Sequence, residues 1–107
     1  MESFNIIYKI LKILEKSMSL EEFDNECISA EVLRIPYPLW CRILKILADN
    51  EYITGIEVWN AMECNYPKVA LVRPEITLQG LEYLQENSVM KKIHNAAKGI
   101  KEVVPGL

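Results

Sequence analysis

Arg42 and Lys45 are the residues whose type and spacing best suit a chemical role, which would be contact with nucleic acid. The planar guanidinium of arginine can donate two parallel hydrogen bonds to guanine, and either cation can contact a phosphate. On a helical wheel that starts at Leu39 and advances about 100° per residue, both fall opposite the apolar stripe, beside Cys41 and Asp49. Asp49 would repel phosphate, so an ordinary solvated helix face remains an open alternative.

A second pair of cations, Lys68 and Arg73, lies on a predicted strand from which both could reach phosphates. Glu57 and Glu63 accompany them, so charges that only keep a hairpin soluble are the simpler alternative. The residues predicted to contact DNA are therefore Arg42, Lys45, Lys68 and Arg73.

The chain carries no motif for catalysis, for a cofactor or for a metal. It has no GxSxG sequence, no phosphate-binding loop and no cysteine and histidine set with the spacing of a zinc site. Cys27, Cys41 and Cys64 form no CxxC pair, and they are expected to be free thiols in a reducing cytosol. His94 is the only histidine and lies among lysines. We therefore expect no enzyme activity, no cofactor and no metal.

Length and charge restrict the class of protein. The 107 residues suffice for a single domain with one modest core. The formal net charge is -3, with -5 on residues 1–66 and +2 on residues 67–107. The chain as a whole therefore has no strong attraction to polyanions. The N-terminal MESFNIIYKILKIL has an acid at position 2 and lysines within the apolar run, so it resembles neither a signal peptide nor a membrane span. We expect a cytoplasmic protein.

The first predicted helix is apolar over an arc of roughly 220°, which exceeds the stripe that one neighbour covers. Lys9, Lys12 and Lys16 share the narrow remaining face and are expected to be solvated. Such a helix needs a second partner, and a last helix over about 88–104 has the required apolar side. The spacing does not decide whether the two helices meet within one chain or in a homodimer.

The order of the elements predicts the fold. The first helix is followed by a short helix capped by Ser29, a third helix over 38–50, strands over 52–59 and 68–73, and a helix capped by Thr77. Gly55 marks a bulge or a close backbone approach in the first strand. This order predicts an α+β, mainly α, winged helix-turn-helix with a two- to three-stranded sheet. A single domain would have its core over about 3–87, with the extra C-terminal helix starting at Asn87-Ser88.

One stretch resembles a known family. Ile76-Thr77-Leu78-Gln79-Gly80-Leu81-Glu82-Tyr83-Leu84 is similar to the I-T-x-x-G-x-x-Y-L sequence that follows the wing of such domains. Together with Glu86-Asn87-Ser88, Met90-Lys91-Lys92 and Pro105-Gly106, it makes nearly the whole chain resemble the YjcQ-like family of small proteins from Gram-positive bacteria and their phages or prophages.

This resemblance implies a winged helix, for which DNA binding is the usual inference from fold. The chain departs from a common winged-helix pattern at Asn50-Glu51, where many relatives of the fold have Glu-Gly. The expected function is that of a small phage-type or prophage-type regulator that binds double-stranded DNA. A homodimer through the first and last helices is the expected assembly. The alternative is a protein-interaction module that kept the fold and does not bind DNA.

Overall fold

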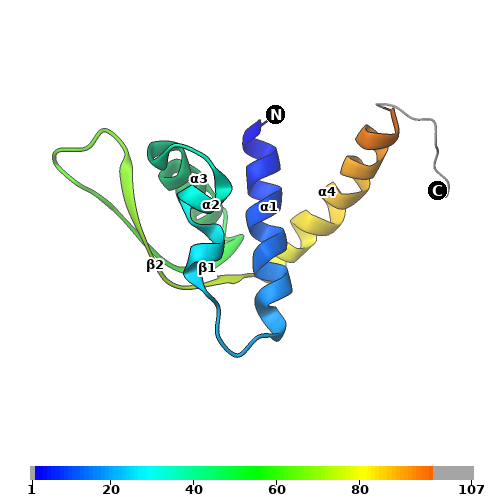
Figure 1. The fold of residues 1–107 in the computed structure, drawn as a ribbon, viewed down its shortest axis with the longest axis horizontal. Helices are drawn as coiled ribbons and strands as arrows, with labels where there is room; N and C mark the ends of the chain where they lie inside the picture. The colour runs from blue at the N-terminus through cyan, green and yellow to red at the C-terminus, as the bar shows by residue number, and fades with distance from the viewer. Residues whose placement is uncertain (1, 98–107) are drawn as a thin grey trace.

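The computed structural model describes the backbone of residues 2–97 and the side chains of residues 3–87. Its elements are α1 (Glu2–Lys16), the 3-10 helices η1 (Ser17–Ser19) and η2 (Asn25–Ile28), α2 (Ala30–Leu33), α3 (Tyr37–Asp49), β1 (Ile53–Asn60), β2 (Pro67–Ile76) and α4 (Leu78–Ala97). Three helices, a hairpin and a further helix form a winged helix, which confirms the predicted fold class. In Figure 1 the hairpin extends to one side of α3, and α4 extends away on the other side of α1.

The core forms where α1, α3 and the base of the hairpin meet. α1 and α3 contribute facing rows of buried apolar side chains. The buried residues of these two helices are Ile6, Ile7, Ile10, Leu11, Leu14, Trp40, Cys41, Ile43, Leu44 and Leu47. α1 also contacts α4 within the same chain, where Leu84 is buried. The second partner that the broad apolar arc of α1 requires is therefore at least partly intramolecular.

The hairpin is bent by a bulge at Gly55, as the sequence predicts. The strands pair antiparallel as Thr54↔Glu75 and Ile56↔Leu71, so Gly55 alone stands opposite three residues of β2. Gly55 has a φ of +82°, and a Cβ there would lie 1.8 Å from the carbonyl oxygen of Arg73. Only glycine fits this site. The bulge also explains why β2 continues through Pro74 to Ile76 beyond its predicted end, since a proline is tolerated where pairing is interrupted.

The I-T-x-x-G-x-x-Y-L stretch forms the joint between the hairpin, the end of α3 and α4. The Thr77 hydroxyl accepts a hydrogen bond from the Gly80 amide (3.1 Å) and donates one to the carbonyl of Glu51. Gly80 has room for no Cβ, because a Cβ would lie 2.4 Å from the carbonyl oxygen of Tyr52. Tyr83 packs on the Tyr52 ring with centroids 5.1 Å apart. The residues of this I-T-x-x-G-x-x-Y-L stretch therefore fix the direction in which α4 leaves the domain.

The predicted start of a separate helix at Asn87-Ser88 is wrong, because α4 is one continuous helix from Leu78 to Ala97. Asn87 does not act as an N-cap. Its side-chain amide instead donates to the carbonyl of Tyr83 one turn earlier (2.8 Å). With no glycine or proline at the junction, two polar residues that favour caps were not sufficient to end the helix. The part of the predicted last helix beyond Ala97 lies outside the described residues.

Candidate nucleic-acid interface

The exposed face of α3 carries Arg42 and Lys45, as predicted, but Cys41 does not belong to it. Cys41 is fully buried, so its predicted place on the solvent face is wrong. The buried stripe is centred nearer Trp40 and Leu44 than Leu39, which is only half-buried, and this rotation brings Cys41 into the core. Ile46 takes part in the outer face instead, with 48% of its surface exposed.

Lys45 is paired on that face with Asp49. The Lys45 ammonium lies 2.6 Å from an Asp49 carboxylate oxygen, one helical turn away. Both side chains are accessible to solvent, so this pair contributes at most about 0.5 kcal/mol to stability. Lys45 can therefore leave Asp49 for a stronger anion at little cost. Asp49 lowers the positive potential of the same surface.

Arg42 and Lys68 meet at the ring of Tyr66, although they come from different elements. The Arg42 guanidinium lies 5.9 Å from the ring centroid and donates to the carbonyl of Asn65 (3.1 Å). The Lys68 ammonium lies 5.6 Å from the same centroid. These contacts tie the middle of α3 to the tip-side end of β2. They place two of the four predicted cations on one surface.

Tyr37, at the start of α3, completes this cluster. Its ring stacks on Trp40 with centroids 5.5 Å apart, and Lys68 lies 5.0 Å from its centroid. Desolvation raises the pKa of the Tyr37 hydroxyl, a hydrogen bond with Cys41 raises it further, and the charge of Lys68 partly opposes both. Tyr37 is therefore a neutral phenol near neutral pH. Sequence reasoning missed Tyr37, and its position between two prolines was the one available sign of a constrained aromatic residue.

Arg73 lies apart from the other three cations. It is exposed near the bulge of β2, where it lines a groove together with Glu75. On α1, Lys12 pairs with Glu15 (3.1 Å), and Lys9 and Lys16 are exposed, as expected for a solvated face of that helix. The structure thus gathers Arg42 and Lys68, keeps Lys45 one turn from Arg42, and separates Arg73.

Two further kinds of function find no support among the described residues. No three His, Cys, Asp or Glu side chains in this part of the chain come together in an arrangement that could hold a metal ion. None of the helices described has both the length and the apolar character needed to cross a membrane. The candidate interface is therefore defined by its cations and aromatic rings.

A comparison with protein-family models matches residues 8–103 to a model described as YjcQ protein. The chain belongs to the YjcQ family. The match covers every predicted DNA-contact residue and the joint from Ile76 to Leu84. Comparisons with curated proteins and with solved structures found no match. Membership of the YjcQ family leaves the function to be argued from the interface.

Proposed function

We propose that this YjcQ-family protein is a small transcriptional regulator, of phage or prophage type, that binds double-stranded DNA. α3 would enter the major groove, and the hairpin would contact the adjacent backbone, which is the usual docking of a winged helix. The cluster of Arg42 and Lys68 around Tyr66 is the observation that carries this proposal. In this cluster one cation from α3 and one from the hairpin lie against the same aromatic ring, so the two can neutralise neighbouring phosphates together.

Each cation has a distinct role in this docking. Arg42 is suited to reach a guanine edge or a phosphate from the middle of α3. Lys45 would exchange its Asp49 partner for a phosphate, and the exposed Ile46 beside it would face the groove. Lys68 would contact the backbone from the hairpin. Arg73 would reach only DNA that follows β2 past the bulge, so its contribution is expected to be the smallest.

The direct test is binding of a random-sequence duplex to the purified protein at low salt, measured by fluorescence anisotropy. Arg42→Ala with Lys45→Ala is expected to weaken binding at least tenfold, since two lost contacts correspond to about 1.4 kcal/mol or more. Lys9→Ala with Lys16→Ala removes the same charge from the far face of α1 and serves as the matched control. If the duplex does not bind at low salt, or if both double variants behave alike, the proposal is wrong.

A protein-interaction module without DNA binding is the second candidate. The pairing of Lys45 with Asp49 favours it, because Asp49 neutralises one of the two cations on the exposed face of α3. The net charge of -3 favours it as well. Absence of duplex binding by a folded protein would leave this candidate in place.

We also propose that the protein forms a homodimer through α1 and α4, because a dimer matches two operator half-sites. Phe4 supports this proposal, since it is exposed at the start of α1 although it lies on the apolar arc of that helix. Light scattering would give twice the mass of one 12.4 kDa chain if this proposal is right. A mass of one chain at all concentrations would contradict the dimer and would mean that α4 packs on α1 only within its own chain.

A further inference from the structure

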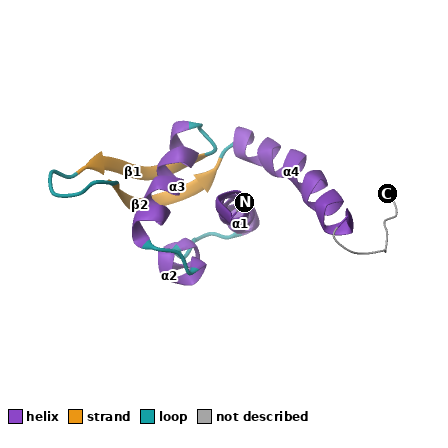
Figure 2. Ribbon diagram, turned by 90° about the horizontal axis from the view of Figure 1, so that it is seen from above, coloured by secondary structure: helices purple, strands orange, loops and turns teal. Residues whose placement is uncertain are grey.

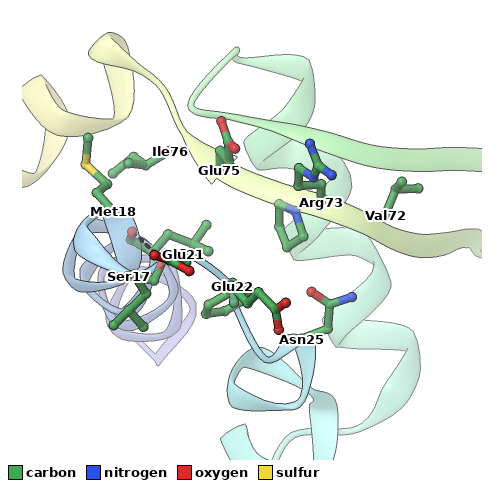
Figure 3. A pocket seen from close by; sticks show the side chains of 13 residues that line it. Ser17, Met18, Glu21, Glu22, Asn25, Val72, Arg73, Glu75 and Ile76 are labelled. Atoms are coloured by element: carbon green, nitrogen blue, oxygen red, sulfur yellow. Dashed lines mark hydrogen bonds between the residues drawn. The ribbon is translucent and has the colours of Figure 1, made fainter.

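A groove runs between the C-terminal end of α1 and the outer edge of β2 (Figure 3). Its volume is about 670 Å³. One wall is formed by the chain that leaves α1 through η1 towards η2, and the other by β2 from Val72 to Ile76. None of the cations Arg42, Lys45 and Lys68 lines it. The groove is therefore separate from the candidate nucleic-acid interface.

The edge of β2 that borders the groove has no partner strand in the part of the chain that the structure describes. β2 pairs with β1 along its other edge, and these two strands make up the sheet there. At one point a side chain stands in for a strand, since the Asn25 amide donates to the carbonyl of Leu71 (3.2 Å). An unpaired strand edge offers backbone donors and acceptors to an added extended chain.

The walls of the groove combine apolar and acidic side chains. Met18, Leu20 and Val72 leave 61%, 60% and 62% of their surfaces exposed, which is unusual for large apolar residues grouped in one place. Glu21, Glu22 and Glu75 line the same groove, and Arg73 is the cation among its lining residues. Three acids against one cation give these walls a net charge of -2.

The acidic character continues past Asn25 into a second, smaller hollow. This hollow has a volume of about 230 Å³ and is lined by the far side of Asn25, by Leu71 and by the rings of Tyr37 and Trp40. Glu26 and Glu31 border it. An acidic pocket with aromatic walls suits the end of a lysine or arginine side chain. Both hollows thus lie along the same unpaired edge of β2 and favour the same charge.

We infer that this groove binds an extended, basic segment of a partner protein, which adds as a strand beside β2. Val72–Ile76 spans about 17 Å at the rise of a strand, so five or six residues of the partner are in reach. Apolar side chains of the segment would cover Met18, Leu20 and Val72. Its lysine or arginine side chains would lie near Glu21, Glu22 and Glu75. Because Pro74 offers no N–H, side-chain contacts must supply a large share of the selectivity.

The test uses a labelled ten-residue peptide of alternating lysine and valine, titrated into the ¹⁵N-labelled full chain. Amide shifts are expected at 17–25 and 71–76, with the exposed face of α3 around Arg42 and Lys45 unaffected. The triple variant Glu21→Gln, Glu22→Gln and Glu75→Gln should weaken binding about tenfold, because it removes the three acidic charges that line the groove. The matched control is Glu57→Gln, Glu63→Gln and Glu82→Gln, which removes three exposed acids outside the groove and should change affinity less than about twofold.

Four outcomes would overturn the inference. The first is the absence of shifts along the groove, and the second is equal affinity for a peptide of alternating glutamate and valine. The third is equal affinity for a lysine-valine peptide methylated on alternate backbone nitrogens, because such a peptide cannot pair as a strand. The fourth is a concentration-dependent shift of groove amides without peptide, which would make a second copy of this chain the occupant. None of these outcomes depends on whether the protein binds DNA.

Discussion

At the scale of single residues, Glu51 is one of two non-glycine residues, with Arg34, that have a positive φ in the described part of the chain. It follows α3 with a φ of 63°, in the left-handed region where helices commonly end on glycine. This is the position at which many winged helices carry Glu-Gly, so the turn is kept while the residue that suits it is absent. Thr77 reinforces the turn by donating a hydrogen bond to the Glu51 carbonyl.

Glu51→Gly is expected to stabilise the protein by about 1 kcal/mol, because it relieves the left-handed strain. Denaturant unfolding would measure the change. Glu82→Gly is the matched control, since Glu82 is exposed on α4 in ordinary helical geometry and its replacement should cost about 1 kcal/mol. Equal destabilisation by both variants would show that Glu51 is not strained.

Asp49 provides the second prediction at this scale. Asp49→Asn removes the acid that pairs with Lys45 and that faces any bound phosphate. Duplex affinity is expected to rise about two- to fivefold, which corresponds to 0.5–1 kcal/mol for an exposed charge. The same anisotropy assay applies, with Glu82→Gln on α4 as the control of equal charge. An unchanged or reduced affinity of Asp49→Asn would place α3 away from the DNA backbone.

At the scale of elements, Thr77 and Asn87 look alike in the sequence and differ in the structure. Each is a residue that favours helix N-caps, yet Thr77 caps α4 whereas Asn87 lies inside it. Thr77→Ala should cost about 1 kcal/mol or more. Asn87→Ala should cost nothing or add a few tenths of a kcal/mol, because alanine is the better helix former. Thermal unfolding would compare the two. A loss of stability of similar size for Asn87→Ala would instead indicate that Asn87 caps a separate helix.

The sequence predicts elements well where one local signal decides them. Ser29 and Thr77 as caps, Gly55 as the bulge and the bounds of α3 within one residue all follow from such signals. The wrong predictions, the helix start at Asn87-Ser88 and the exposed position of Cys41, arise where two sequence signals favour different outcomes. A helical wheel leaves Cys41 outside the apolar stripe when that stripe is taken to include Leu39, whereas the buried stripe is centred nearer Trp40 and Leu44. The joining of Arg42 and Lys68 at Tyr66 depends on how the hairpin folds against α3, which spacing along the chain cannot show.

At the scale of the whole molecule, the ionisation of tyrosine links stability to alkaline pH. Burial raises the pKa of Tyr83 above its ordinary value of 10.0, and the neighbouring Tyr52 raises it further. The unfolded chain therefore loses this proton first. The contribution of Tyr83 to stability is constant below pH 10 and should fall as the pH rises from there through the folded pKa. Tyr83→Phe keeps the ring and should make the fall less steep.

Denaturant unfolding at a series of alkaline pH values tests this link. Other groups also titrate in the same range, so the comparison is between the slopes of Tyr83→Phe and the wild-type chain rather than between absolute values. Tyr37→Phe offers a second comparison, because the pKa of Tyr37 is raised in the same direction. Identical slopes for the wild type and Tyr83→Phe would contradict the expected link.

The two proposed binding surfaces differ in charge, which has a consequence for the whole molecule. Arg42 and Lys68 concentrate positive charge at the junction of α3 and the hairpin, whereas the groove beside β2 is acidic. The net charge of -3 therefore conceals two regions of opposite sign. Polyanions and basic segments would approach different parts of the surface.

α4 is a long helix that can act as a lever, because it extends from the joint at one of its ends. Its twenty residues measure about 30 Å, and it leaves the body from the joint at Thr77 (Figures 1 and 2). A rotation of about 10° at that joint moves the far end of the helix by about 5 Å. The Thr77 hydroxyl donates a hydrogen bond to the Glu51 carbonyl at the end of α3. This bond couples the direction of α4 to the orientation of α3, the helix proposed to read DNA. A small tilt of α3 would be amplified at Ala97.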